Sequence, residues 1–241
     1  MAYILFHIPH SSLKIPSIYF SICTKNKDFI NKFNIELSDY LTDKLIPNNC
    51  HKLIFKYSRL FCDVEKFKDD SKEIMSQKGM GVIYTKIYNN IITIPNKKYK
   101  TKVIKSYYDK HHNKLNKIVI QSLKNNNKCI LIDFHSFSDE MVNKLFNIIN
   151  TPDICIGIDK KYTNQKLLNF TINYFKKYDY SVKINTPYSG TMIPNKFINK
   201  NNRNFSSIMI EINKRIYLNN KKDFIKLKNC IENYYKIIKK F

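Results

Sequence analysis

The sequence lacks any apolar run close to the roughly 20 residues that a membrane-spanning helix requires, so we expect no membrane partner. Its N-terminus has no basic stretch followed by a long apolar one, so we expect no signal peptide. Six cysteines are present, but none forms a CxxC or CxxH pair. This pattern argues against a zinc ribbon or a disulfide framework and favours reduced core cysteines in a cytoplasmic protein.

Arginine is also scarce, since only Arg59, Arg203 and Arg215 occur in a chain with 42 Lys and Arg, 19 Asp and Glu and a net charge of +23. Such a charge can indicate a nucleic-acid partner. However, lysine and asparagine are abundant throughout, and no basic stripe with interleaved aromatic residues stands out. We therefore expect the charge to be spread over the surface, without a nucleic-acid partner. The few arginines are expected where a planar fork is needed.

Alternating strand and helix patterns predict the fold class. Short apolar runs predict buried strands, and apolar residues at helical spacing predict the helices between them. This order is typical of an α/β fold with a mixed, mostly parallel sheet and helices on both faces. Without an internal repeat or a linker, a single domain over residues 1–241 is expected. The predicted strands are 3–8, 52–56, 60–64, 129–134, 153–157, 181–184 and 208–212, the predicted helices are 28–45, 101–124, 162–178 and 221–240, and residues 66–100 are expected to form a long excursion of functional importance.

Two of the six histidines follow predicted strands. His10 comes after YILFHIP, and His135 comes after the apolar run CILIDF. Because ligands bind beyond the carboxyl ends of strands in α/β sheets, the two imidazoles can converge on one ligand. Neutral imidazoles with a carboxylate make a catalytic zinc set, which leaves one position for water. The alternative is that each is an ordinary, hydrogen-bonded loop histidine.

Two charged residues lie in unexpected places. Glu211 interrupts the apolar strand SIMIEI, where a carboxylate is costly unless it is paired or acts on a bound water. It is therefore a candidate general base, and the alternative is a structural ion pair with a nearby basic residue. Arg59 precedes Asp63 by four residues in YSRLFCDVEKF. It can polarise a carbonyl oxygen or clamp a carboxylate, or it can form a structural pair with Asp63.

Nine segments, in this order, resemble the N-formylglutamate amidohydrolase family over about residues 3–220. They are HIPHSSLKIP, LSDYLTDKL, YSRLFCDVEKF, GVIYT, YYDKHHNKL, IDFHSF, DICIGID, NTPYSGTMIP and MIEINKRIYL. That family is similar to the zinc carboxypeptidases and aspartoacylases, which have a mixed α/β sheet and one catalytic zinc. The resemblance implies a zinc-dependent amidohydrolase that uses an activated water to cleave an amide of a small anionic N-acylated amino acid such as N-formylglutamate.

The resemblance also implies a ligand set for Zn²⁺. His10 and His135 would be the histidine ligands. The carboxypeptidase pattern has a glutamate three residues after the first histidine, but this chain has Leu13 there, so the acidic ligand must come from elsewhere. Asp39, on the first predicted helix, is the preferred candidate, and the alternatives are Asp43 and Asp63.

Other roles follow from the resemblance in the same way. Glu211 matches the general base and Arg59 the arginine that polarises the scissile carbonyl. The family usually reads Asp-x-Asn-Arg where this chain reads Asp63-Val64-Glu65-Lys66, and in related enzymes the Asn and Arg hold the substrate carboxylate. Lys66 can attract a carboxylate only as a point charge, and Glu65 would repel one. The candidate substrate contacts are Lys66, His112, Ser189, Gly190 and Arg215.

Two alternative functions remain open on the sequence. A zinc peptidase or amidase could act on a peptide or cell-wall amide, with residues 66–100 shaping a wider groove. Alternatively, a basic scaffold that has drifted at Glu65 and Lys66 could bind nucleic acid without being an enzyme. Near-stoichiometric zinc would favour a hydrolase, whereas salt-sensitive binding of nucleic acid by metal-free protein would favour the binder.

Overall fold

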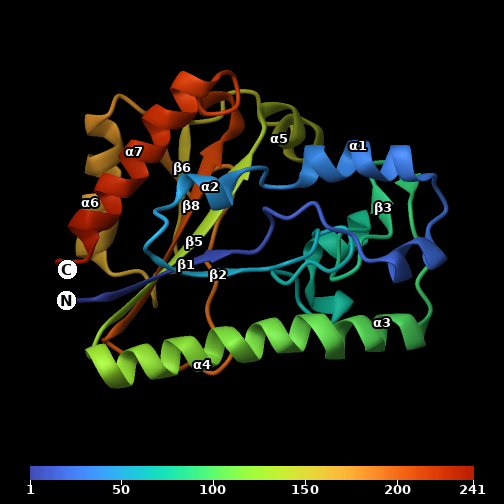
Figure 1. Cartoon of the computed structure of the whole chain (residues 1–241), viewed down its shortest axis with the longest axis horizontal. Coiled ribbons are helices and arrows are strands. Elements are labelled where there is room, and N and C mark those ends of the chain that lie inside the picture. The colour runs from blue at the N-terminus through green and yellow to red at the C-terminus, as the bar shows by residue number, and fades with distance from the viewer. The chain divides into compact units, whose positions relative to one another are not determined.

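The computed structural model describes all 241 residues, which divide into two compact units (Figure 1). The sheet unit comprises Met1–Ile8, Leu41–Leu53 and Asn116–Phe241, and the loop unit comprises Pro9–Tyr40 and Ile54–Leu115. None of the helices is both long and apolar enough to cross a bilayer. The six cysteines are all free thiols, and five of them are buried, as the sequence predicted.

The sheet unit is built on a six-stranded sheet with the strand order β2-β1-β5-β8-β6-β7. Neighbours β1, β5 and β8 run parallel, β6 is antiparallel to β8, and β7 is parallel to β6. The α/β class with a mixed, mostly parallel sheet is therefore confirmed. The strands are β1 Tyr3–Ile8, β2 His51–Ile54, β5 Cys129–Phe137, β6 Ile154–Gly157, β7 Val182–Ile184 and β8 Phe205–Asn213.

Helices cover both faces of this sheet, since every residue of the central strands β5 and β8 is buried. In Figure 1, α6 and α7 lie on one side of the sheet, and the end of α4 that belongs to this unit passes on the other side. Helix α7 turns one apolar stripe inward, which includes Leu227, Ile231, Tyr234 and Ile238. The helices are α2 Thr42–Leu45, α4 Asp109–Asn126, α5 Asp139–Phe146, α6 Gln165–Lys177 and α7 Lys221–Ile238, with a short 3₁₀ helix at Lys214–Ile216.

The loop unit consists of helices and long irregular segments. Helix α1 (Lys27–Leu37) begins at Asn26, whose side chain accepts a hydrogen bond from the Phe29 N–H, and it buries Ile30, Asn34 and Leu37 on one face. The other elements are α3 Lys97–Val103, a π-helical turn Ile104–Tyr108 that leads into α4, the hairpin strands β3 Lys86–Ile87 and β4 Asn90–Ile91, and 3₁₀ helices at Ser17–Ile22, Asp70–Lys72 and Ile74–Lys78. The predicted excursion 66–100 thus consists mainly of short elements and loops.

The structure corrects two local predictions. The helix predicted over residues 28–45 is broken, because α1 ends at Leu37 and Leu41 adopts a left-handed conformation with φ 64° before α2 begins. The strand predicted over residues 60–64 is wrong, since the N–H groups of Phe61 and Cys62 donate to the Ser58 carbonyl and close a turn. In the first segment the apolar residues keep helical spacing throughout, and in the second they form a short run typical of a strand. The hydrophobic pattern therefore shows neither the break in the helix nor the turn.

The remaining differences concern the ends of predicted elements and one helix that was not predicted. The central strand β5 extends to Phe137, three residues beyond the prediction, so His135 lies within the strand together with Asp133. The helix predicted over residues 101–124 begins at Lys97 and continues to Asn126 through the π-helical turn. Helix α5 was not predicted, although the side chain of Ser138 caps it by accepting a hydrogen bond from the Met141 N–H.

Candidate active site

In the sheet unit, four polar side chains lie on one face near the carboxyl ends of three parallel strands. The register pairs His7 of β1 with Asp133 of β5, and His135 of β5 with Glu211 of β8. Paired residues on neighbouring strands, and residues two apart on one strand, project to the same face. All four are at most 7% exposed. Two sequence candidates, His135 and Glu211, are therefore neighbours in the fold.

Asp133 connects this group. Its Oδ1 accepts a hydrogen bond from His7 Nδ1 at 2.8 Å and lies 3.1 Å from His135 Nε2, while its Oδ2 accepts from the Met192 N–H at 2.8 Å. Burial would raise the pKa of Asp133, but the charge of His135 and the hydrogen bonds with His135 and His7 hold it below its usual range. Asp133 is therefore a buried carboxylate that stays ionised at neutral pH.

Glu211 lies in the interior of the sheet, where β8 has a neighbour on each side. Its register partners are His135 on the parallel strand β5 and Cys155 on the antiparallel strand β6. The guanidinium of Arg215, one of the basic residues near Glu211 in sequence, contacts Asp139 at 2.8 Å and Asp153 at 2.9 Å. Arg215 thus joins α5 to the segment before β6, and its predicted contact with substrate stays a prediction.

The loop unit gathers a second group around His10. Its Nε2 donates to Asp63 Oδ1 at 2.8 Å, and its Nδ1 lies 3.6 Å from Asp39 Oδ2. The Asp39 N–H also donates to the His10 carbonyl, which fixes the two backbones side by side at the break after α1. Arg59 and Tyr84 complete the group through Asp63. The structural Arg–Asp pair considered from the sequence is therefore present.

Asp63 accepts five hydrogen bonds. Its Oδ1 takes those of His10 Nε2 and the Glu65 N–H, and its Oδ2 takes those of Arg59 Nε at 3.2 Å, Arg59 Nη2 at 3.0 Å and the Tyr84 hydroxyl at 2.9 Å. Burial opposes ionisation, but the charges of His10 and Arg59 and the hydrogen bond from His10 hold the pKa of Asp63 well below its usual value. The stability that this carboxylate contributes is present above its unfolded pKa of about 4 and is lost as the pH falls through the depressed value.

These contacts separate the three candidate acidic ligands. Both oxygens of Asp63 are taken up by hydrogen-bond donors, whereas a carboxylate oxygen of Asp39 faces the opposite ring nitrogen of His10. Asp43 lies on α2 in the sheet unit, and its carboxylate is 2.9 Å from the ammonium of Lys44. A buried imidazole nitrogen beside a buried carboxylate oxygen is a suitable donor pair for Zn²⁺, so Asp39 fits the ligand role best.

The other predicted site residues have mixed surroundings. His112 donates from Nε2 to the Val64 carbonyl at 2.7 Å, which is a structural contact. The ammonium of Lys66 lies 3.7 Å from a carboxylate oxygen of Glu73. Ser189 is exposed in the loop after β7, and Gly190 beside it has a φ of 85°, a conformation that favours glycine. No side-chain contact of Ser189 identifies a ligand, and its role stays a prediction.

The two buried groups, one around Asp133 and one around His10, include three side chains to which the sequence analysis assigned no role: His7, Asp133 and Tyr84. A signal existed for Asp133, because it precedes His135 by two residues on an apolar strand and therefore shares its face. His7 and Tyr84 are recognised only from their hydrogen-bond partners, which lie 126 and 21 residues away in the chain.

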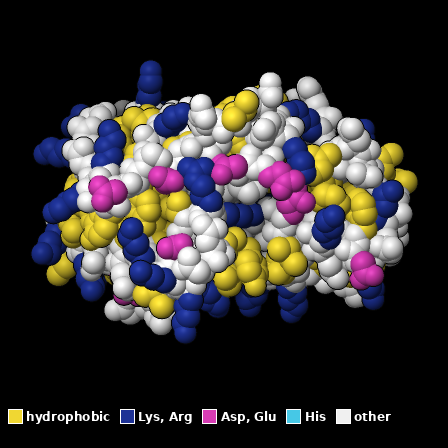
Figure 2. Space-filling model, turned by 90° about the horizontal axis from the view of Figure 1, so that it is seen from above, with side chains coloured by type: hydrophobic (Ala, Val, Ile, Leu, Met, Phe, Trp, Pro, Cys, Tyr) yellow, Lys and Arg dark blue, Asp and Glu magenta, His cyan; other side chains and the backbone are white.

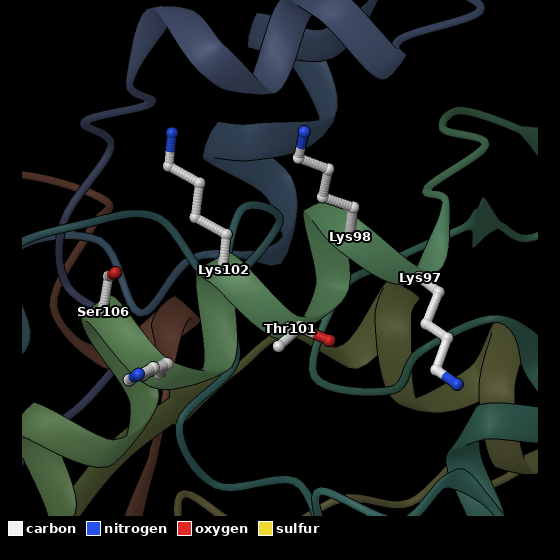
Figure 3. A pocket seen from close by; sticks show the side chains of 6 residues that line it. Lys97, Lys98, Thr101, Lys102 and Ser106 are labelled. Atoms are coloured by element: carbon white, nitrogen blue, oxygen red, sulfur yellow. The ribbon is translucent and has the colours of Figure 1, made fainter.

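The basic residues are scattered over the face shown in Figure 2, as the composition suggested, but one segment is denser. Residues 97–117 contain eight lysines and one acidic residue. Part of this segment lines a hollow of about 560 Å³ in the loop unit, in which Lys98 and Lys102 extend to the same side of the helix (Figure 3). The lining residues are Lys97, Lys98, Thr101, Lys102, Lys105 and Ser106.

Comparisons with known proteins agree with these observations. The sequence model of the family described as N-formylglutamate amidohydrolase matches residues 2–218. The N-formylglutamate amidohydrolase of Ralstonia eutropha JMP134 has a similar structure, with a TM-score of 0.80, 17% identity, and coverage of 95% of this chain and 90% of that one. A gene product of Agrobacterium tumefaciens is also similar, with a TM-score of 0.73, 15% identity, and coverage of 99% and 92%. No curated protein matches the chain.

Proposed function

Because the chain belongs to the N-formylglutamate amidohydrolase family, whose members hydrolyse carbon–nitrogen bonds other than peptide bonds, we propose that it cleaves the amide of a small anionic N-acylated amino acid such as N-formylglutamate, with zinc as its cofactor. The observation that supports this proposal best is the chemical environment of two histidines. Each unit holds a buried histidine with one ring nitrogen beside a buried carboxylate. We place this activity in the cytoplasm, in keeping with the six free cysteines.

The proposed zinc ligands are His10, Asp39 and His135. In metal sites a ligating histidine usually gives its second ring nitrogen to a carboxylate, which leaves the other nitrogen for the metal. His10 Nε2 faces Asp63, so Nδ1 of that ring is the proposed ligand atom.

Bound zinc would act as a Lewis acid and lower the pKa of a water ligand. In the proposed reaction, Glu211 accepts a proton from the attacking water and gives it to the leaving nitrogen. Arg59 stabilises negative charge on the carbonyl oxygen as the tetrahedral centre forms. Three of its five N–H groups donate to Asp63 and to the Leu37 carbonyl, so the guanidinium is held in place while two N–H groups remain for substrate.

The proposed substrate contacts are Lys66, His112, Ser189, Gly190 and Arg215. Lys66 supplies positive charge for a substrate carboxylate, and the fixed hydrogen bond from His112 to the Val64 carbonyl anchors the segment that carries it. The loop of Ser189 and Gly190 is joined to the sheet at Met192, whose N–H donates to Asp133. Asp139 and Asp153 already hold the guanidinium of Arg215. Of the five residues, Arg215 is therefore expected to contribute least directly to substrate binding.

An assay over a panel of substrates tests this proposal. We expect kcat/KM for N-formylglutamate and other anionic N-acyl amino acids to exceed that for uncharged N-acyl amino acids and short peptides by at least about tenfold, or about 1.4 kcal/mol. Formate or free amino acid released by the zinc-loaded protein is measured. Higher kcat/KM for peptides or cell-wall amides would overturn the proposed substrate in favour of the second hydrolase function.

A double variant tests the effect of Glu65 and Lys66, which stand where the family usually has Asn and Arg. Glu65→Asn with Lys66→Arg removes one negative charge and supplies a bidentate fork, so kcat/KM for N-formylglutamate is expected to rise at least about tenfold. The backbone hydrogen bond from residue 65 to Asp63 is retained in both proteins. Lys66→Arg alone serves as the matched control and is expected to give a smaller gain. An unchanged kcat/KM in the double variant would show that this segment does not bind the carboxylate.

The lysine-lined hollow favours nucleic-acid binding as a second candidate function. Its four lysines are expected to bind single-stranded DNA with an affinity that falls steeply between 50 and 200 mM salt. A variant with Lys97, Lys98, Lys102 and Lys105 changed to Gln should weaken binding at least about tenfold at low salt. A matched variant with four Lys→Gln changes on α7 (Lys221, Lys222, Lys228 and Lys236) controls for net charge, and equal loss in both would show that the hollow is not a specific surface.

A further inference from the structure

We propose that Tyr84 is a positioning residue that fixes the guanidinium of Arg59 for the proposed reaction. The inference rests on the proposed function, since it concerns the group that would stabilise the carbonyl oxygen. Tyr84 belongs to the segment GVIYT at residues 81–85, which the proposed mechanism leaves without a role. Tyr84 is not assigned contact with substrate, so its effect on the reaction passes through Arg59.

Asp63 holds Arg59 through a single oxygen atom. Its Oδ1 is taken by His10 Nε2 and the Glu65 N–H. Both Nε and Nη2 of Arg59 therefore converge on Oδ2, at 3.2 Å and 3.0 Å. An arginine that pairs with both oxygens of a carboxylate is fixed in direction by two parallel hydrogen bonds. Arg59 lacks that arrangement with Asp63, so its guanidinium can pivot about Oδ2 unless other contacts prevent it.

Tyr84 supplies two contacts that oppose such a pivot. Its hydroxyl donates to the same Oδ2 atom at 2.9 Å, so the oxygen about which Arg59 would turn is itself held. The Cζ atom of Arg59 lies over the ring of Tyr84, 5.8 Å from its centroid, which is within the range of a cation–π contact and restricts the tilt of the guanidinium. Nη1 of Arg59 adds longer contacts, at 3.3 Å from the Leu37 carbonyl oxygen and 4.0 Å from a carboxylate oxygen of Asp39.

Tyr84 can act in this way because its own position is fixed. The residue is completely buried, and its carbonyl accepts a hydrogen bond from Thr93 Oγ1 at 2.6 Å. The Asp63 N–H donates to the Val82 carbonyl at 2.8 Å, so the backbone two residues before Tyr84 is tied to Asp63 as well. Arg59, Asp63 and Tyr84 all belong to the loop unit, so the whole arrangement lies within one compact part of the chain.

Tyr84→Phe removes the hydroxyl but keeps the ring. We expect it to lower kcat about tenfold with KM within about twofold of wild type, because Arg59 acts on charge that develops only in the transition state. Tyr88→Phe is the matched control, since the Tyr88 hydroxyl also donates to a carboxylate of the loop unit, that of Glu36, and its kcat should stay within about twofold of wild type. Initial rates, zinc content and thermal melting are measured for each protein.

A double-mutant cycle shows whether the effect passes through Arg59. If it does, Tyr84→Phe should lower kcat by less than about twofold in a protein that already carries Arg59→Ala. A loss of equal size in both backgrounds would overturn the inference, because Tyr84 would then act independently of Arg59. Loss of zinc from Tyr84→Phe would overturn it too, because the effect would then pass through His10.

The scarcity of arginine allows a readout that involves neither substrate nor metal. With only three arginines in the chain, the Nε–H signals in a nitrogen-15 NMR spectrum are few, and that of Arg59 is the one missing from Arg59→Lys. In the metal-free protein we expect the Arg59 Nε–H to exchange with solvent at least about tenfold more slowly than that of the exposed Arg203. Tyr84→Phe should remove most of this protection, and Tyr88→Phe should retain it.

This readout distinguishes failure of the inference from failure of the proposed function. A protein that does not hydrolyse N-acyl amino acids would refute the proposed function, while protection of Arg59 that is lost in Tyr84→Phe would still support the positioning role. Unchanged protection in folded Tyr84→Phe would overturn the inference. So would an Arg59 Nε–H that exchanges as fast as that of Arg203 in wild type, a result that requires no variant of Tyr84 to fold.

Discussion

Replacing Glu211 by Gln is expected to lower kcat at least about 10²-fold, with little change in KM. The amide has nearly the shape of the carboxylate but cannot accept a proton from the attacking water. Because the proposed zinc ligands are untouched, the variant should keep its full metal content. Its stability should be equal or higher, because an amide is less costly to bury on β8 than a charge.

The measurement combines initial rates, zinc content and thermal melting for the two proteins. Glu140→Gln is the matched control, since Glu140 is exposed on α5 and pairs with Lys144, so kcat should stay within about twofold of wild type. A folded, zinc-loaded Glu211→Gln protein with wild-type turnover would exclude Glu211 as the general base. A large loss of both zinc and activity would place Glu211 among the metal ligands instead.

The architecture could be predicted from the sequence where burial on both faces produces continuous apolar runs. β1 matches the predicted strand 3–8, and β6 matches 153–157 within one residue, because strands buried on both faces of the sheet contain few polar residues. The prediction failed where a tertiary hydrogen bond overrides a local preference. The apolar segment 60–64 reads as a strand, but five donors converge on Asp63 and hold the chain in a turn.

In the candidate site, too, some residues could be predicted from the sequence but their contacts could not. A histidine just after an apolar strand and a glutamate inside one are conspicuous in the sequence, which is why His135 and Glu211 could be selected. Their adjacency depends on the β5–β8 register, which joins residues 76 positions apart and leaves no local trace. Asp39 was selected on a helix that the structure breaks just before it. The break itself positions Asp39, because its N–H bonds the His10 carbonyl in place of a helical partner.

Removing zinc is expected to abolish turnover, and adding Zn²⁺ back should restore it. Among single substitutions, His10→Ala should lose both zinc and activity, with kcat/KM lowered at least about 10³-fold. This expectation follows from the donor set, since His10 supplies one of the two proposed imidazoles and its loss leaves a site of two ligands. Zinc content by atomic absorption and formate release from N-formylglutamate are measured on the same preparations.

The three candidate acids should then behave differently, which makes the ligand assignment testable. Asp39→Ala should lose zinc but stay folded. Asp63→Ala removes the closest carboxylate partner of the largely buried guanidinium of Arg59, so it should lower the free energy of unfolding by about 3 kcal/mol, whatever its metal content. Asp43→Ala is the control and should change neither property, because its carboxylate forms only a surface pair with Lys44. Full zinc content in Asp39→Ala would exclude Asp39 as the ligand, and zinc lost from Asp43→Ala would reassign the role to α2.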